Sequence, residues 1–308
     1  MATKTAVNAP LTHHKSGRKI GKTLRARLGA LAPHFILIPY SLLALFPLAL
    51  IIINSLKDRR DLFRSPYQPP VWFSFEDGFQ IVNTFSTSGY EQVFTRANVL
   101  LFFANSLIVT GGSLFLILLT GSMISFALAE YKFRGSRFLS LYMAIGIMIP
   151  IRLGTISLIE TLRTMGLYNT LWALILVYAA SGLPVAVFVL TEYMRQVPKE
   201  LKDAARVDGA SEYRILFVFV MPIIRPALAT VLVFNMLPIW NGLWFPLTLA
   251  PGEKVQTVTL GLSAFAGQYK TDWTALLAAL TLAMIPMLAL YTIFSRQFIS
   301  GLTRGAVK

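Results

Sequence analysis

Long apolar runs alternate with shorter polar segments along this chain of 308 residues. A membrane-spanning helix needs about 20 mostly apolar residues, because only a helix satisfies its own backbone hydrogen bonds in hydrocarbon. A helix buried in a soluble bundle would carry a polar stripe that repeats about every 3.6 residues, and no such stripe occurs in the run LFLILLTGSMISFALA. The pattern therefore predicts an all-α membrane protein with six transmembrane helices, at 34–56, 99–129, 138–159, 170–191, 226–250 and 274–295.

Composition agrees with this pattern and excludes several kinds of functional site. Hydrophobic residues make up 55% of the chain and charged residues only 14%, against roughly 25% in an average soluble domain. The absence of cysteine excludes disulfides, thiolate metal sites and cysteine nucleophiles. The three histidines are His13, His14 and His34, and the apolar runs hold no paired carboxylates. We therefore expect neither a catalytic nor a metal site. Prolines within several runs predict kinked helices.

Basic residues at the two ends of the chain predict its orientation. Residues 1–32 carry seven basic side chains and no acidic one, whereas the loops at 57–98 and 251–273 balance their charges. Basic segments stay on the cytoplasmic side, and an even number of spans places both termini there. The predicted organisation is a basic cytoplasmic tail near anionic lipid at 1–32, a transmembrane domain at 33–298 with an extracytoplasmic loop at 57–98 and a cytoplasmic loop at 192–225, and a cytoplasmic tail at 299–308.

The loop at 192–225 is a charged, helix-forming segment between two apolar runs. Pro198 suits the first turn of a helix, and Leu201, Ala204 and Ala205 recur at a helical spacing that places them on one small apolar face. The segment has six basic and five acidic residues, and this mixed charge is a poor signature of a helix lying on lipid headgroups. The pattern favours a short amphipathic helix that contacts another protein.

A sharp turn is predicted directly after this helix. Gly209 can adopt the left-handed backbone conformation that ends many helices. Either Asp208 or Ser211 can cap the segment that follows. That second segment runs on to Pro222 and the fifth apolar run.

Residues 203–222 also carry a spaced motif: Asp203-Ala204-Ala205, three residues, Gly209, nine residues, and Phe219-Val220-Met221-Pro222. It resembles the cytoplasmic loop of bacterial ABC importer permeases, which reads Glu-Ala-Ala, three residues, Gly, nine residues, then an aliphatic residue, any residue and Leu-Pro. Every spacing agrees. Aspartate, phenylalanine and methionine replace the glutamate, the aliphatic residue and the leucine. The aspartate keeps the charge but reaches one methylene less far, which alters ion-pair geometry rather than the docking role.

Similar segments extend the resemblance over all but the first 30 or so residues. They are typical of the carbohydrate-type branch of the family, which includes the second membrane subunit of the maltose system. The segments are Asn105-Ser106-Leu107, Phe126-Ala127-Leu128-Ala129, Phe133-Arg134-Gly135, Trp240-Asn241 with Pro246-Leu247, where Leu243 replaces a phenylalanine, and Gly301-Leu302-Thr303-Arg304-Gly305-Ala306-Val307-Lys308.

The resemblance implies a transport subunit rather than an enzyme. In this family, two permeases form one pathway through the bacterial cytoplasmic (inner) membrane, two ATPase subunits bind ATP and Mg beneath them, and a solute-binding protein delivers a sugar or sugar-like solute from outside. This chain would bind no cofactor, since Gly17 and Gly21 lack the spacing of a phosphate-binding loop, and no nucleic acid partner is expected. The residues implied to couple to the ATPase are Asp203, Ala204, Ala205, Asp208, Gly209 and Ala210.

Two other functions fit the sequence less well. A stand-alone secondary transporter is the alternative, but ion-coupled carriers often use acidic residues within their spans, and this chain has few there. A membrane scaffold or lipid-modifying enzyme is disfavoured by the lack of a nucleophile, metal ligands and acid pairs.

Four residues are candidates for the substrate pathway: Arg152, Asn105, Trp240 and Asn241. Arg152 lies within the third apolar run, where a charge faces a cavity, pairs with a carboxylate such as Glu160, or extends toward the membrane interface. An aromatic face beside an amide suits a sugar at Trp240 and Asn241. The alternative is that these two residues shape helix packing.

Overall fold

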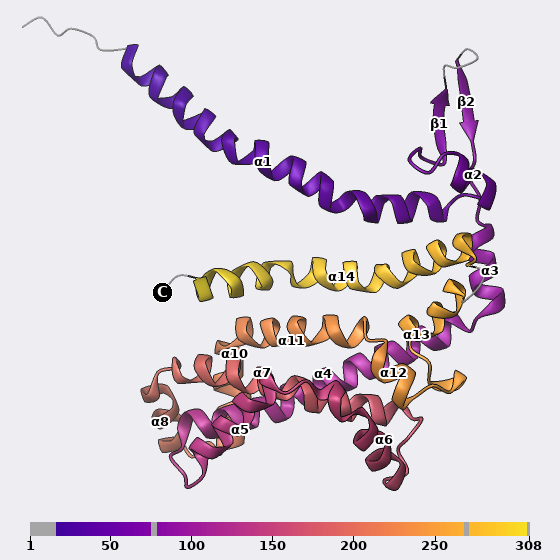
Figure 1. Ribbon diagram of the computed structural model, residues 1–308. Helices are drawn as coiled ribbons and strands as arrows, with labels where there is room; N and C mark the ends of the chain where they lie inside the picture. The colour runs from indigo at the N-terminus through magenta and orange to yellow at the C-terminus, as the bar shows by residue number, and fades with distance from the viewer. Residues whose placement is uncertain (1–16, 75–78, 268–270, 307–308) are drawn as a thin grey trace, which may run out of the picture. The chain divides into compact units, whose positions relative to one another are not determined.

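The computed structural model describes residues 17–74, 79–267 and 271–306, and the side chains within residues 33–292 of these ranges. By its internal contacts the chain forms two units, residues 1–51 and 52–308. Helices make up most of the regular structure, as Figure 1 shows. The first part of the predicted basic tail, residues 1–16, lies outside the described residues.

The first unit contains most of α1 (Gly17–Ser55). Its apolar part, Pro33–Ser55, is long enough to cross a membrane. Residues 17–32, which the charge pattern assigns to the tail, are helical and continuous with this candidate span.

Three helices of the second unit are also long and apolar enough to span. They are α4 (Val99–Glu130), α7 (Leu171–Arg195) and α14 (Trp273–Ala306), in which the candidate span is Trp273–Thr292. All three coincide with predicted runs. The helix α14 continues to Ala306, so most of the predicted tail at 299–308 is helical.

Two further candidate spans are sharply bent. One joins α5 (Ser136–Met148) through η1 (Ile151–Gly154) to α6 (Thr155–Thr164), at 88°. The other joins α9 (Glu212–Arg214), the π-helical η2 (Ile215–Val220) and α10 (Met221–Ile223) to α11 (Arg225–Trp240), at 83°. Among the described residues there are thus four unbroken candidate spans, or six if each bent pair counts as one.

A proline stands at the first of these breaks. Pro150 separates α5 from η1 and contributes no backbone N–H donor. The single helix predicted at 226–250 is divided in two. The helix α11 ends at Trp240, and a separate helix, α12 (Trp244–Leu249), follows a turn. Short elements then lead to α14: η3 (Glu253–Val255), α13 (Val258–Ser263) and η4 (Ala264–Ala266).

The loop predicted at 57–98 contains regular structure, including the strands that an all-α prediction leaves out. The antiparallel strands β1 (Val71–Ser74) and β2 (Gln80–Asn83) form a small hairpin. It is flanked by α2 (Arg59–Arg64) and α3 (Ser88–Arg96).

The most extensive contact between helices in the second unit joins α4 and α7. Small side chains let the two helices approach closely: a Cβ atom at Gly121 would lie 3.3 Å from the Cβ atom of Ala186. The buried hydroxyl of Ser125 donates a hydrogen bond to the Val187 carbonyl over 3.2 Å. These contacts make α4 and α7 a closely packed pair.

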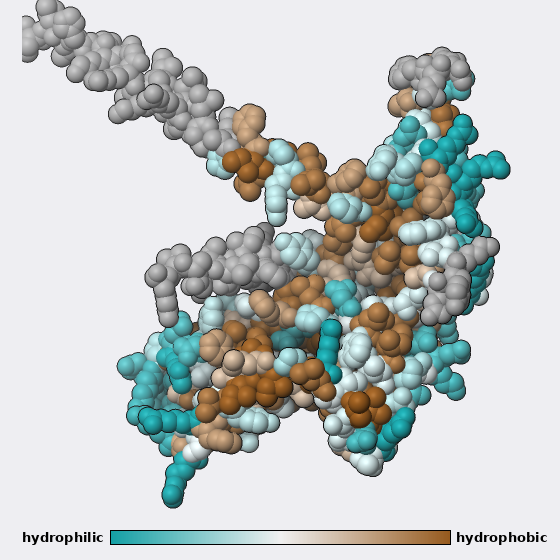
Figure 2. Space-filling model, in the orientation of Figure 1, coloured by the Kyte–Doolittle hydropathy of each residue, from teal (hydrophilic) through white to brown (hydrophobic). Residues whose placement is uncertain are grey.

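Polar and apolar side chains are separated on the surface of the second unit. On the face shown in Figure 2, hydrophilic residues gather around α2 and α3 at one end and near α8 (Lys199–Val207) at the other, with hydrophobic residues between them. Many large apolar side chains of the spans are exposed, for example Phe115 at 64% and Phe188 at 62%. A surface of this kind suits contact with lipid or another membrane subunit.

Candidate functional site

The segment that carries the spaced motif begins with α8 and ends in a left-handed turn. Gly209 has a φ of 78°, a conformation that glycine adopts more easily than other residues. Its N–H donates to the Arg206 carbonyl over 3.0 Å, and the Ala210 N–H donates to the Ala205 carbonyl over 2.9 Å. These are the two bonds of a Schellman motif, so the predicted helix end at Gly209 is confirmed.

The helix α8 has an inward and an outward side. Lys202 and Ala205 are each 5% exposed, whereas Val207 is 88% exposed. Leu201 and Ala204 are also exposed, so the small apolar face that their spacing predicts is divided between the two sides. Among the residues implied to couple, Asp203, Ala204, Asp208 and Gly209 are exposed, Ala210 is half-buried, and Ala205 is buried.

A buried carboxylate holds the inward side of α8. Glu130 is the last residue of α4, and its side chain is only 7% exposed. Its Oε2 accepts a hydrogen bond from Lys202 Nζ, and its Oε1 accepts one from Arg206 Nη2 over 3.0 Å. Each of these charges therefore has a partner of opposite sign, as buried charges in proteins require.

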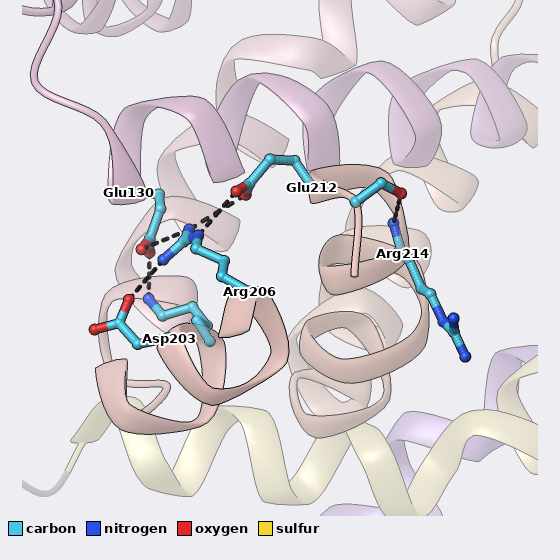
Figure 3. Close-up of polar contacts among 7 residues, drawn as sticks. Glu130, Asp203, Arg206, Glu212 and Arg214 are labelled. Atoms are coloured by element: carbon cyan, nitrogen blue, oxygen red, sulfur yellow. Dashed lines mark hydrogen bonds and ion pairs between the residues drawn. The ribbon is translucent and has the colours of Figure 1, made fainter. Parts of the chain in front are cut away.

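Arg206 contacts two more carboxylates, as Figure 3 shows. Its Nη1 donates to Asp203 over 2.8 Å, and its Nε and Nη2 donate to the two oxygens of Glu212 over 2.8 and 3.2 Å. The bond to Glu212 is the main cause that raises the pKa of Arg206, and the guanidinium in turn lowers the pKa of the Glu212 carboxyl. Through this one side chain, α8 is tied to both α4 and α9.

The segment after the turn is also capped within the chain. Ser211 Oγ accepts a hydrogen bond from the Arg214 N–H over 3.3 Å. Of the two residues predicted as possible caps, Ser211 is therefore the one that caps α9. Asp208 is instead the C-cap residue of α8. From Arg214 the chain passes through η2 and α10 into α11.

A second candidate site lies at the bend between α5 and α6. A cavity of about 370 Å³ is lined by residues of this bend, α7, α11 and α12. Its polar residues are Arg152, Tyr178, Ser181 and Asn235, and its aromatic rings include Trp244 and Phe245. Tyr178 is 5% exposed, and its hydroxyl has no hydrogen-bond partner among the described residues.

Close backbone approach shapes this cavity. A Cβ atom at Gly182 would lie 2.2 Å from Asn235 Oδ1, and one at Gly242 would lie 1.9 Å from the Tyr178 hydroxyl oxygen. Such distances leave no room for a side chain, so both positions require glycine in this arrangement. Trp244 is oriented by the hydrogen bond from its Nε1 to Thr155 Oγ1, over 3.0 Å.

Only one of the four predicted pathway residues, Arg152, lines this cavity. It forms no ion pair with Glu160 among the described residues. Asn105 is buried and donates both amide hydrogens, to the Lys254 carbonyl over 3.0 Å and to the Gln256 carbonyl over 2.9 Å.

The other two predicted pathway residues lie at the end of α11. Trp240 is buried, and its indole N–H donates to the Ala283 carbonyl of α14 over 3.3 Å. Asn241 is exposed just beyond the helix. The Trp240 contact is what the helix-packing alternative expects.

Sequence reasoning missed the residues that complete both sites. Glu130 could have been singled out in the sequence, because it is a carboxylate directly after a long apolar run. Its partners could not, because Lys202 and Arg206 lie 72 and 76 positions away. Asn235 was a second signal, as an amide within an apolar run. Within the part of the chain that the structure describes, no three His, Cys, Asp or Glu side chains are placed to hold a metal ion.

Comparison with known proteins gives a consistent result. Residues 117–304 match the family described as binding-protein-dependent transport system inner membrane component. The chain is 31% identical to the diacetylchitobiose uptake system permease protein NgcG of Streptomyces coelicolor, over 89% of this chain and 88% of that protein. It is 33% identical to the arabinooligosaccharides transport system permease protein AraQ of Halalkalibacterium halodurans, over 86% and 92%.

Solved structures show the same fold. One chain in the crystal structure of a bacterial ABC transporter, involved in the import of the acidic polysaccharide alginate, matches with a TM-score of 0.70. The match covers 93% of this chain and 99% of that chain, at 20% sequence identity.

Proposed function

The chain belongs to the family of binding-protein-dependent transport system inner membrane components, and from this premise we propose that it is a permease subunit of an ATP-driven importer. It pairs with a second permease to form a pathway across the bacterial cytoplasmic membrane, with six spans and both termini on the cytoplasmic side. A solute-binding protein delivers a sugar or sugar-like solute, and two ATPase subunits bind ATP and Mg.

The observation that carries this proposal is the outward side of α8. Val207 is 88% exposed and Tyr213, just after the turn, is 65% exposed, while charged contacts fix the inward side to the rest of the chain. A short, rigid element with exposed apolar groups suits docking to a partner protein. We assign the ATPase contact to this side, including Ala204, Asp208 and Gly209.

The names of the relatives support a sugar as the cargo. NgcG and AraQ are described as permeases for diacetylchitobiose and arabinooligosaccharides, and MelC of Bacillus subtilis, 30% identical over 85% of this chain, as an import permease for melibiose, raffinose and stachyose. The cavity at the α5–α6 bend fits this class of molecule. Aromatic rings offer apolar faces to sugar carbons, and hydroxyl, amide and guanidinium groups offer hydrogen bonds to sugar hydroxyls.

Arg152 and the Tyr178 hydroxyl are therefore our pathway residues in this chain. Trp240 and Asn105 are satisfied by backbone carbonyls, which supports a role in holding the helices around the pathway. Asn241, exposed at the end of α11, is proposed as a residue of the pathway wall.

A pull-down from native membrane tests the proposal. Tagged wild-type protein is purified in mild detergent beside Gly209→Arg and Gly209→Asn variants, and co-purifying chains are identified by mass spectrometry. We expect wild type to recover a second permease and a Walker-motif ATPase. Arginine should lose the ATPase, because it strains a left-handed turn and adds bulk to the docking side. Asparagine should keep it, since it tolerates this backbone conformation.

The structure makes the arginine variant informative. An added Cβ atom at Gly209 would meet nothing of its own chain within 4 Å, so a clash inside the protein would not explain a loss of partner. Recovery of the chain alone from wild type would contradict the importer assignment and favour a stand-alone transporter. Recovery of the ATPase with all three proteins would contradict the docking assignment.

A further inference from the structure

We propose that Glu130 is a positioning residue that fastens α8 to the end of α4, so that a movement of α8 is delivered to the membrane helices. This inference rests on the proposed function and adds to it the place inside the chain where the movement is transferred. It concerns the inward side of α8, which is separate from the outward side assigned to the ATPase.

The geometry of Glu130 makes it a two-point attachment. Its two oxygens contact Lys202 and Arg206, which lie four residues apart and hence about one turn apart on α8. Two contacts along one helix restrain rotation about its axis as well as displacement, whereas a single contact would act as a pivot. The side chains of Glu130 and Lys202 are each 7% exposed, so water screens this attachment little.

The attachment continues from α8 into two membrane segments. Glu130 ends α4, which packs closely along α7. Arg206 also binds Glu212, the first residue of the segment that leads through η2 into α11. One cluster, which we define as Glu130, Lys202, Arg206 and Glu212, therefore joins α8 to the ends of both segments, and a displaced α8 would carry them together.

The chain itself offers a contrast that separates this role from surface charge. The ion pair between Arg195 and Glu192 has side chains 52% and 55% exposed and joins residues of the same helix, α7. Exposed pairs of this kind contribute little to stability, and this one links no separate elements. Glu192→Gln is therefore a control that removes the same charge without cutting a connection.

The test measures how α8 moves relative to α4 in the assembled complex. Spin labels are placed on cysteines at Glu200 of α8 and Phe115 of α4, both exposed, in a chain that has no native cysteine, with partner chains also made cysteine-free. Pulsed electron paramagnetic resonance gives the distance distribution without nucleotide and with Mg and a non-hydrolysable ATP analogue. The complex is compared as wild type, Glu130→Gln and Glu192→Gln.

We expect wild type and Glu192→Gln to show one distribution that nucleotide leaves unchanged, because α8 and α4 move as one body. Glu130→Gln should match them without nucleotide, since the amide keeps the shape of the side chain, and should shift or broaden when nucleotide is added. The ATPase should still co-purify with Glu130→Gln, because the docking side is intact.

Three results would overturn the inference while leaving the proposed function in place. The first is a distance distribution in Glu130→Gln that nucleotide does not change. The second is a distance distribution in this variant that is already broadened without nucleotide. The third is loss of the ATPase from this variant. The last two would show that Glu130 maintains the fold or the docking side rather than transferring motion. A wild-type preparation without any ATPase would instead overturn the proposed function itself.

Discussion

Arg206 and Arg152 differ in how their charges are satisfied. Arg206 is held by Glu130, Asp203 and Glu212, at distances from 2.8 to 3.0 Å for the closest contact of each. Arg152 lies at the bend of a membrane segment, lines a cavity and has no ion pair among the described residues. A charge satisfied by its own chain fixes structure, whereas a charge left beside a cavity is available to a solute or a partner.

Removal of Arg206 should have the largest effect on stability. The Arg206→Ala variant removes the contacts to Glu130, Asp203 and Glu212 together, and a hydrogen bond to a charged group contributes about 1.5–3 kcal/mol. Thermal unfolding of the purified protein measures this as a lower midpoint. Arg195→Ala, which removes an exposed pair, should change stability by less than about 0.5 kcal/mol. Equal shifts in the two variants would remove the distinction between the cluster and surface charge.

Removal of the Tyr178 hydroxyl should weaken binding of the transported solute rather than destabilise the fold. Because this hydroxyl has no partner among the described residues, Tyr178→Phe breaks no internal hydrogen bond. Loss of one hydrogen bond to the solute should raise the half-saturating concentration for uptake about tenfold. Uptake of the labelled oligosaccharides named for the relatives, by cells that carry each variant, gives this value.

Tyr168→Phe is the matched control for that experiment. The Tyr168 ring lies under the Arg163 guanidinium at 4.8 Å, a contact that phenylalanine keeps, and it does not line the cavity. We expect wild-type uptake from this variant. A Tyr178→Phe variant that also transports like wild type would mean that the cavity does not contact the solute.

Acidification should have the smallest effect, through Glu212. Arg206 lowers the pKa of this carboxyl below its ordinary value of about 4.5, so the ion pair contributes its full stability above that pH and loses it as the pH falls through the lower folded value. The unfolding midpoints of wild type and Glu212→Gln should therefore differ at pH 7, and the difference should shrink as the pH is lowered below the ordinary pKa of the carboxyl. The difference is small because the Glu212 side chain is 43% exposed. A difference that stays constant with pH would contradict this ionic contribution.

The sequence predicts the lengths of the helices and their local turns better than the angles between helices. The apolar runs locate the four unbroken candidate spans, and Gly209 marks the end of α8 because only a local backbone conformation is involved. The bends of 88° and 83° depend on how several helices pack after a proline or a helix end, and hydropathy contains no such information. The α1 helix shows a related limit, since basic residues before a span do not reveal whether they remain helical.

The candidate sites show the same limit at the level of side chains. Asn105 and Asn235 are both amides within apolar runs, yet only Asn235 lines the cavity, while Asn105 binds two backbone carbonyls. Polarity alone cannot tell these roles apart, because each amide can be satisfied by backbone, side chain or solute. The pairing of Glu130 with Lys202 was hidden for a different reason, since it joins residues 72 positions apart.

The most direct test of the importer account is a crosslink from the outward side of α8. The chain lacks cysteine, so Val207→Cys and Thr164→Cys each provide one exposed thiol, on α8 and at the end of α6. Benzophenone maleimide is attached and photolysed in membrane vesicles, and adducts are identified by mass spectrometry. The account predicts a covalent adduct with a Walker-motif ATPase from position 207 and none from position 164. No ATPase adduct at position 207 in intact membranes, or the same adduct at both positions, would contradict it.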